Sequence, residues 1–199
     1  MRLLFASTNT AKVAEVTAVA ASLGVLVEGL GDFTIRRAIG SPPTISEVGT
    51  TYYENACTKA LSYALWSGTP TIADDSGIEV PSLGSLPGVY TAGFGFARLR
   101  DMLVPDLAHE ATFRCCMCFA DPMGRSVSVQ GAIDGLLCFP RSAATPSSSV
   151  PYSHFFTPNG ENESLATLSA RGGYSSHRVK ALTLLLSVLD LTDHVAGRE

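Results

Sequence analysis

The hydrophobic residues of this chain form two kinds of pattern, which alternate along its first half. Apolar residues at a spacing of three to four favour helices, and they occur at 11–24, 51–68, 96–105 and 175–191. Short apolar runs between turn residues favour strands, and they occur at 2–7, 25–30, 70–73, 78–80, 111–121 and 126–139. The early alternation and the late hairpin, joined at 121–125, predict an α/β fold with a mixed sheet.

Capping residues support the helix predictions. Thr51 is followed three residues later by Glu54, which is the spacing of a capping box at a helix start. Gly68 is placed to end that helix. Ser175 or Ser176 is placed to cap the start of the last helix.

Composition and charge narrow the function classes. With 46% hydrophobic and 16% charged residues, the 199-residue chain is predicted to form a single globular domain, 1–199. A net charge of −4 and the lack of a long basic run argue against a nucleic-acid partner. No apolar run reaches membrane-spanning length, and the first run turns polar too early for a signal peptide.

The cysteines favour a reducing compartment. They number five, an odd count clustered mainly in one apolar segment, which argues against a secreted disulfide framework and for a cytoplasmic protein. Cys115 and Cys118 have the spacing of a zinc-binding pair, but the segment is predicted to be a strand. Positions three apart in a strand face opposite sides, so a core strand is favoured over a zinc site.

The first segment with candidate chemistry is STNTAK, residues 7–12, between the first strand and the first helix. A helix N-terminus offers backbone N–H groups and the positive end of the helix dipole. Hydroxyls and a lysine there suit a phosphate. The alternative is a simple N-cap turn with a surface lysine.

The second segment is Asp74-Asp75-Ser76-Gly77, which follows an apolar run and is predicted to be an acidic turn. Two ionised carboxylates side by side repel each other, and a bound divalent cation commonly offsets this repulsion. A carboxylate beside such a metal can also orient or deprotonate a water molecule. The pair therefore suggests a metal and water site at a strand end, with a solvated turn as the alternative.

Two further places carry polar candidates. Ser176-His177-Arg178 opens the last predicted helix. Cations at a helix start oppose the helix dipole, which indicates a second task, such as donating hydrogen bonds to a purine carbonyl or a phosphate. A solvated helix end is the alternative. Glu47, in the loop before residue 51, could complete a metal site, whereas Glu54 suits the capping box.

Taken together, four segments resemble one family, the inosine triphosphate pyrophosphatases, or non-canonical purine nucleoside triphosphate pyrophosphatases. The segments are STNTAK, TYYENACTKA (51–60), ADDSGIEVPSLGSLPGVYTAGF (73–94) and SSHRVKAL (175–182). The family has a T-x-N-x-x-K loop, a T-F-x-E-N-A helix, an A-D-D-S-G block leading to P-G-V-Y, and an S-H-R helix, in this order. The resemblance covers nearly the whole chain.

The resemblance implies a fold, a reaction and a set of site residues. The fold is an elongated α/β sheet with flanking helices, two lobes around a central cleft, and a homodimer. The reaction hydrolyses ITP, dITP and XTP to the monophosphate and pyrophosphate with Mg²⁺, which removes them from the nucleotide pool. The implied roles are metal ligation by Glu47, Asp74 and Asp75, catalysis by Asp75 as general base and by Lys12, and substrate binding by Ser7, Thr8, Asn9, Lys12, Ser76, His177 and Arg178.

The departures from the family pattern lie on the base-recognition side. The usual G-F-G-Y-D-P is replaced by the SSVPYS stretch, where Tyr152 is either the base-stacking ring or a loop residue. The family lysine five residues before His177 is Gly172 here, and we hypothesise that the neighbouring Arg171 stands in for it. Gly93 replaces an arginine, and Thr8 replaces a glycine.

The residues expected to bind the metal and activate water, namely Lys12, Glu47, Asp74 and Asp75, are all present. The pattern therefore suggests retained hydrolysis with altered base specificity. Three hypotheses follow from it. The first is a magnesium-dependent pyrophosphatase acting on non-canonical purine triphosphates. The second is the same chemistry on a different or modified nucleotide. The third is a catalytically weak protein that binds nucleotides.

Overall fold

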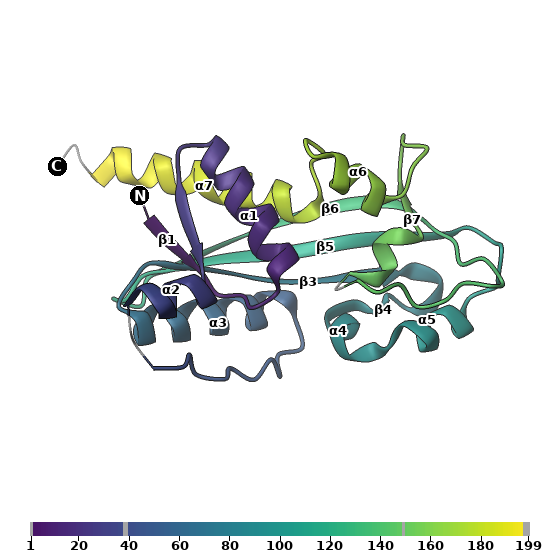
Figure 1. The fold of residues 1–199 in the computed structure, drawn as a ribbon, viewed down its shortest axis with the longest axis horizontal. Helices are drawn as coiled ribbons and strands as arrows, with labels where there is room; N and C mark the ends of the chain where they lie inside the picture. Colours follow the sequence, from purple (N-terminus) through teal and green to yellow (C-terminus); the bar gives the residue numbers. More distant parts are fainter. Residues whose placement is uncertain (1, 38–39, 149, 197–199) are drawn as a thin grey trace. The chain divides into compact units, whose positions relative to one another are not determined.

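A mixed β-sheet with helices on its faces organises the chain (Figure 1). The computed structural model describes residues 2–37, 40–148 and 150–196, and within them the sheet has seven strands. The strand order is β2-β1-β3-β5-β6-β7, with β4 paired to β3. The strands are β1 (Arg2–Phe5), β2 (Leu26–Gly29), β3 (Thr71–Val80), β4 (Leu86–Pro87), β5 (His109–Ala120), β6 (Ser126–Leu137) and β7 (Phe156–Pro158).

The sheet is parallel at one end and antiparallel at the other. Strand β1 pairs in parallel with both β2 and β3, whereas β3–β4 and β6–β7 are antiparallel. The predicted mixed α/β sheet is therefore confirmed. Parallel neighbours need a crossover connection, which α1 (Thr10–Ser22) provides between β1 and β2.

The helices predicted from hydrophobic spacing are present, and two helices of seven residues or more were missed, as was the four-residue α4 (Thr91–Phe94). The predicted ones are α1, α3 (Tyr52–Ser67), α5 (Phe96–Met102) and α7 (His177–Ala196). The longer missed ones, α2 (Leu30–Arg37) and α6 (Leu165–Arg171), have only eight and seven residues. So short a segment carries little periodic signal, because it completes only about two helical turns.

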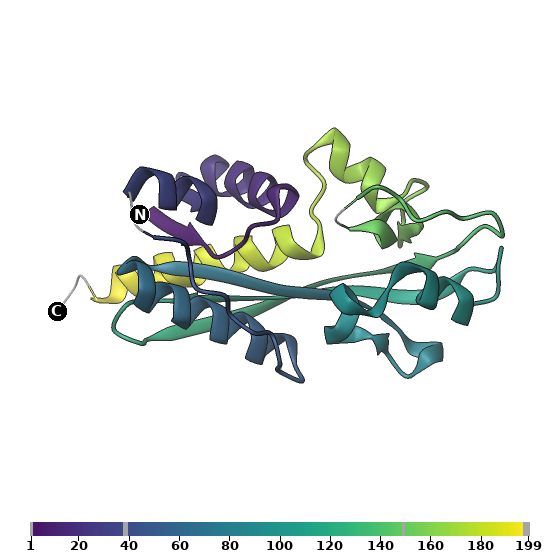
Figure 2. The ribbon, with the colours of Figure 1, turned by 60° about the horizontal axis from the view of Figure 1, so that its bottom comes forward.

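The start of α3 shows the predicted capping box. The Thr51 side chain accepts a hydrogen bond from the backbone N–H of Glu54, and the Glu54 side chain accepts one from the backbone N–H of Thr51. Gly68 ends the helix in the left-handed conformation, with φ of 61°. The loop before α3 runs alongside that helix (Figure 2), and the Tyr63 hydroxyl donates to the Pro43 carbonyl at 2.8 Å.

The described chain divides into two compact units. The first comprises Met1–Asp75, Cys115–Gly131 and Arg178–Glu199, and the second comprises Ser76–Arg114 and Ala132–His177. The elongated shape, the two lobes, the cleft and the single-domain organisation stay predictions.

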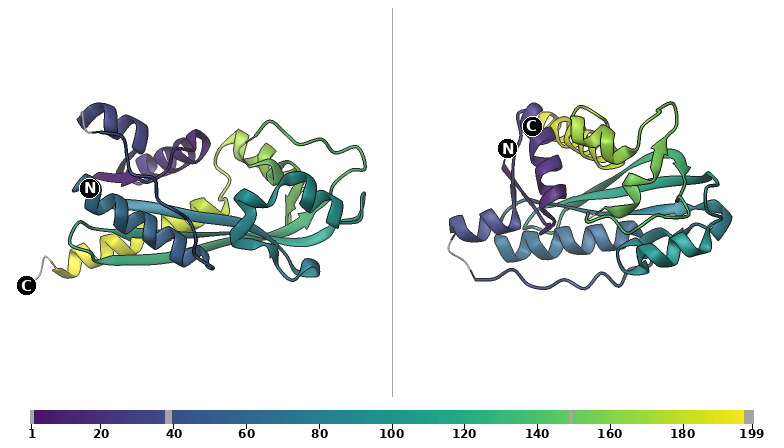
Figure 3. Two further views of the ribbon diagram at one scale, coloured as in Figure 1. Left: turned by 90° about the horizontal axis from the view of Figure 1, so that it is seen from below. Right: turned by 45° about the vertical axis from the view of Figure 1, so that its right-hand side comes forward.

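In the first unit, two separate cores cover opposite faces of the strands. Leu3, Val16, Ile72 and Leu182 belong to the core under α1 and α7. The other core, under α2 and α3, includes Leu4, Phe33, Ala60, Ala73 and Cys118. Figure 1 and the right-hand view of Figure 3 both show α1 and α7 on one side of these strands and α3 on the other. Neighbours along one strand alternate between the two cores, as the pleat requires.

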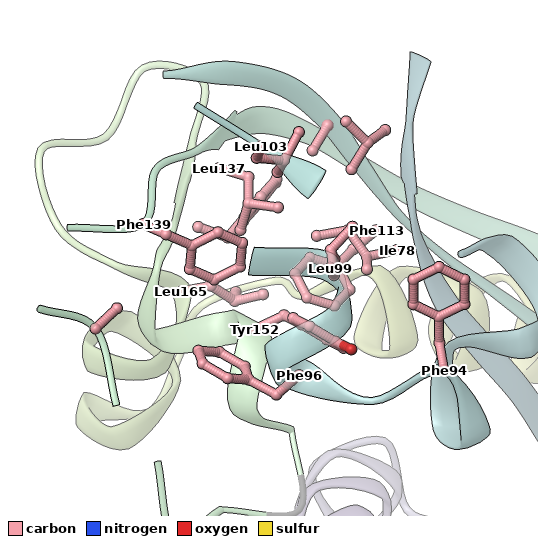
Figure 4. Packing of buried hydrophobic residues seen from close by; sticks show 14 of the residues in the cluster. Ile78, Phe94, Phe96, Leu99, Leu103, Phe113, Leu137, Phe139, Tyr152 and Leu165 are labelled. Carbon is pink, nitrogen blue, oxygen red and sulfur yellow. The ribbon is translucent and has the colours of Figure 1, made fainter. Parts of the chain in front are cut away.

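The second unit has an aromatic core (Figure 4). It gathers side chains from α5, from α4 (Thr91–Phe94), from the short 3₁₀ helix η3 (Pro151–His154) and from the strand segments of this unit. The Phe96 ring stacks against Tyr152, with centroids 5.8 Å apart, and meets Phe139 edge-on. No helix within the described residues is long and apolar enough to cross a membrane.

One local prediction is wrong. Residues 74–77 do not form a turn, because β3 runs without interruption from Thr71 to Val80. The acidic pair therefore lies inside a strand. The cost of burying the two carboxylates is offset by specific partners on each face, and this compensation cannot be seen from local sequence propensity.

Candidate active site

Asp74 and Asp75 point to opposite faces of β3. The Asp74 carboxylate contacts Lys12 of α1 and Arg178 of α7. The Asp75 carboxylate contacts Asn55 of α3. Successive side chains of a strand alternate between the two faces, so the adjacent acids enter two different environments. All five of these residues belong to the first unit.

Asp74 is a buried carboxylate held by cations. Its side chain is 2% exposed, and its oxygens lie 2.9 Å from Lys12 Nζ and 3.0 Å from Arg178 Nε. Arg178, itself 5% exposed, also contacts Glu15 at 2.6 Å. Burial alone would raise the pKa of Asp74, but Lys12, Arg178 and Lys59 outweigh it and hold that pKa far below its usual range. Asp74 therefore stays ionised and organises the cations around it.

Asp75 is held by a neutral amide. Asn55 Nδ2 donates to Asp75 Oδ2 at 2.9 Å, and both residues are buried. Burial raises the pKa of Asp75, and the Glu47 carboxylate adds to the rise, while the Asn55 hydrogen bond and the Lys59 ammonium act against it. A carboxylate with a raised pKa suits a general base, because its affinity for a proton is increased.

The Asn55 amide also binds the loop that carries Glu47. Asn55 Oδ1 accepts a hydrogen bond from the backbone N–H of Gly49 at 2.8 Å. A Cβ atom at Gly49 would lie 2.7 Å from Asn55 Oδ1 and 2.7 Å from Glu54 Cβ, so the close approach requires glycine. Because its oxygen faces Gly49, the amide presents its N–H to Asp75, and one side chain links the loop to the acid.

Lys59 links the side chain of Glu47 to the backbone of Asp74. Its Nζ lies 3.1 Å from the Glu47 carboxylate and donates to the Asp74 carbonyl oxygen at 2.5 Å. Lys59 is one helical turn after Asn55, so both side chains lie on the same face of α3. The Glu47 side chain is 45% exposed and the Lys59 side chain 11%. Glu47 is therefore tethered near Asp75 while its carboxylate still reaches solvent.

The donor set near Asp75 partly suits magnesium. Mg²⁺ prefers one or two carboxylates together with substrate phosphates and water, and Asp75 and Glu47 supply two carboxylates. Asp74 does not suit this role, because it faces the other side of the strand and binds two cations. Across 2–37, 40–148 and 150–196, no three or more His, Cys, Asp or Glu side chains gather closely enough to hold a metal.

The STNTAK segment forms the N-terminus of α1, as predicted. Asn9 is the N-cap, and its Oδ1 accepts from the backbone N–H groups of Ala11 and Lys12 at 3.1 and 3.2 Å. Ser7 Oγ accepts from the backbone N–H of Asn9 at 3.2 Å, and Thr8 is exposed. The N-cap turn is confirmed, but Lys12 is not the surface lysine of that interpretation, because its side chain is 20% exposed and its ammonium extends from this turn to Asp74.

The second unit contains Ser76, expected to contact the substrate, and three residues expected on the base-recognition side, namely Tyr152, Arg171 and His177. His177 is 4% exposed, and its ring stacks on Phe113 with centroids 5.0 Å apart. Tyr152 is 3% exposed and packs in the aromatic core. Arg171 is exposed at the end of α6 and bonds to Glu163 at 2.6 Å. Tyr152 lies in the short helix η3 and not in an irregular loop, and its role as the base-stacking ring stays a prediction.

Sequence reasoning missed Asn55 and Lys59. Both are polar residues that the structure buries on α3, with relative exposures of 4% and 9%. Their four-residue spacing beside the apolar face of the helix was an available signal. An amide or ammonium on a buried helix face needs a polar partner, and the acids of β3 are those partners.

The chain is similar to proteins of the Ham1 family and to dITP/XTP pyrophosphatases. The model of the Ham1 family matches residues 3–188. A dITP/XTP pyrophosphatase of Deinococcus radiodurans is 35% identical over 196 residues, covering 94% of this chain and 92% of the relative. A dITP/XTP pyrophosphatase of an Exiguobacterium species is 33% identical over 186 residues, covering 86% and 92%.

A solved structure shows the same fold. The HAM1 protein of Coxiella burnetii superposes with a TM-score of 0.74 at 24% identity. The alignment covers 96% of this chain and 98% of that protein.

Proposed function

The chain belongs to the Ham1 family, and on that premise we propose that it hydrolyses non-canonical purine nucleoside triphosphates to the monophosphate and pyrophosphate. It is an enzyme of the dITP/XTP pyrophosphatase family, so the resemblance described from its sequence is confirmed. The names of its relatives support dITP and XTP as substrates, with ITP as a third purine of the same class.

The proposal rests on one observation: the two acids of β3 have different partners on opposite faces of the strand. Asp75 has a raised pKa and a neighbouring carboxylate, Glu47, which suits activation of water. Asp74 holds two cations, Lys12 and Arg178, which suit the negative charge of a triphosphate. Water activation and phosphate binding are the two requirements of phosphoanhydride hydrolysis.

In the proposed reaction, Asp75 accepts a proton from the water that attacks the α-phosphorus. The bond from that phosphorus to the bridging oxygen breaks, and pyrophosphate leaves with the oxygen. Asn55 keeps the Asp75 carboxylate oriented, because its amide is itself held by Gly49. A magnesium ion held by Asp75 and Glu47 would neutralise phosphate charge and make the bound water more acidic.

We assign the triphosphate to the start of α1. Ser7, Thr8 and Asn9 form the turn, and helix N-termini favour anions. Lys12 would move part of its contact from Asp74 to the substrate and offset the negative charge that develops there. Asp74 takes the role of positioning Lys12 and Arg178, in place of the metal ligation implied by the family resemblance.

Recognition of the base by Tyr152, Arg171, His177 and Arg178 stays a prediction, as does the contact of Ser76 with the substrate. Arg178 already bonds to Asp74 and Glu15, which favours a positioning role over direct contact with the purine. Arg171 bonds to Glu163, so its guanidinium is already engaged. The departures from the family pattern at Gly93 and Gly172 support the alternative that the same chemistry serves a different or modified nucleotide. The homodimer and the cytoplasmic location also stay predictions.

Pyrophosphate release from dITP, XTP, ITP and the four canonical triphosphates, with Mg²⁺, tests the proposal. We expect release from the non-canonical purines and its loss in Asp75→Asn. Release from another nucleotide alone would support the alternative substrate. Nucleotide binding without release would leave only the weak nucleotide-binding hypothesis.

A further inference from the structure

Two cysteines from different elements meet in the core beneath α3. Cys57 lies on α3 and Cys118 on β5, and their Sγ atoms are 2.8 Å apart. Non-bonded carbon atoms normally pack at about 3.5–4.0 Å, and sulfur is larger than carbon. A disulfide bond measures about 2.05 Å. The fold therefore brings two thiols that are 61 residues apart in the chain to within a short movement of covalent bonding.

The other cysteines nearby are placed differently. Cys116 lies two residues before Cys118 and belongs to the same core, so both point to the same face of β5. Cys115 belongs to the core on the opposite face. Cys138 belongs to the second unit. The contact is thus specific to Cys57 and Cys118, and Cys116 provides a matched control in the same cluster.

Cys57 is the less deeply buried residue of the pair. Cys57 is 8% exposed and interacts with Tyr53, which is 53% exposed, whereas Cys118 is fully buried. Hydrogen bonding with Cys118 lowers the pKa of Cys57, an effect to which Tyr53 and Ser128 contribute and which burial opposes. The same hydrogen bond, followed by burial, raises the pKa of Cys118. Because Cys57 is the less buried thiol and the hydrogen bond lowers its pKa, it is assigned as the attacking thiol, and Cys118 is the partner that resolves the mixed disulfide.

We propose that Cys57 and Cys118 are a reversible dithiol–disulfide site whose oxidant is a small organic disulfide. The Cys57 thiolate attacks one sulfur of the small disulfide, which forms a mixed disulfide and releases one small thiol. The Cys118 thiol then loses its proton and attacks Cys57 Sγ, which breaks the mixed bond and releases the second small thiol. Two protein thiols are oxidised to one disulfide, and the small disulfide is reduced to two thiols.

The cross-link would lock the helix that supports the candidate active site. Cys57 lies two residues after Asn55 and two before Lys59, the side chains that reach Asp75, Glu47 and the Asp74 carbonyl. A bond across a long loop restricts the unfolded chain more than the folded one. Because the sulfur atoms are already close, little strain opposes this gain. We expect the melting temperature to rise by about 8 °C or more on oxidation.

The test exposes the folded full-length chain to glutathione disulfide and then blocks the remaining thiols. We expect a mass loss of two hydrogen atoms before blocking and, after digestion, a cross-link between the tryptic peptide with Cys57 and the peptide that runs from Cys115 to Arg125. Fragment ions between Cys116 and Cys118 locate the bond. Dithiothreitol should reverse both the mass change and the rise in melting temperature.

Variants give the matched comparison. Cys116→Ala should still form the cross-link and gain the same thermal stability. Cys57→Ala and Cys118→Val should show neither effect. If a variant fails to fold, the fragment ions of the unmodified chain still decide which sulfurs are joined. A bond to Cys115 or Cys116, a stable mixed disulfide on Cys57, no oxidation, or an unchanged melting temperature would overturn the proposal.

Discussion

Asp74 and Asp75 are adjacent in the chain, yet their carboxylates lie on opposite faces of β3 and have opposite partners. Asp74 binds the cations of Lys12 and Arg178, whereas Asp75 accepts a hydrogen bond from Asn55. The same relationship gives the two acids opposite pKa shifts.

Neutralising each acid in turn should give different defects. Asp75→Asn should reduce kcat by about 10²–10⁴-fold, because the amide cannot accept the proton of water. Asp74→Asn should instead lower the free energy of unfolding by about 3 kcal/mol, because Lys12 and Arg178 lose a buried counter-charge. Pyrophosphate release and urea denaturation measure the two effects. If Asp75→Asn unfolded the chain and Asp74→Asn left its stability intact, these roles would be reversed.

Asn55→Ala should lower kcat about 10–100-fold with little change in the KM for the nucleotide, because it frees both Asp75 and the loop that carries Glu47. Gly49→Ala should cause a defect of the same kind, since its Cβ would lie 2.7 Å from Asn55 Oδ1. Glu110→Gln, at an exposed position of the second unit, is the control. A change in KM alone would show that Asn55 serves substrate binding.

The two acids should affect acid stability with opposite signs. Asp74 has a lowered pKa in the folded protein, so its stabilisation is present above the unfolded carboxyl pKa of about 4 and is lost as pH falls below it. Asp75 has a raised folded pKa, so its contribution is present below about 4 and is lost as pH rises through the folded value. Urea midpoints between about pH 3 and pH 7 should therefore fall less on acidification in Asp74→Asn than in the unchanged protein. An equal fall in both proteins would contradict the assigned role of Asp74.

Glu47→Gln should raise the Mg²⁺ concentration that gives half-maximal turnover by about tenfold, because one of the two proposed carboxylate ligands is lost. The same variant should bind Mn²⁺ more weakly without nucleotide, which can be measured by electron paramagnetic resonance. Thr51→Ser, which keeps the capping hydroxyl of α3, is a control from the same region. An unchanged metal requirement would remove Glu47 from the site.

Local sequence signals determined much of the secondary structure and part of the candidate site. The capping box of α3, the N-cap at Asn9 and the hairpin between β5 and β6 all depend on residues that are close together in the chain. A short window of sequence is therefore enough to predict them. Local patterns had already singled out Lys12, Glu47 and Asp75 as candidates, and the family resemblance added a specific role for each.

Only the tertiary structure decided what each acid does. Whether residues 74–77 turn or continue as a strand depends on the counter-charges of Lys12 and Arg178, and Arg178 lies 104 residues from Asp74. The roles of Asn55 and Lys59 likewise depend on which face of α3 meets the sheet. Burial is costly for a polar group without a partner and tolerable for one with a partner. That partner is chosen by packing between distant segments, so a local pattern could not reveal it.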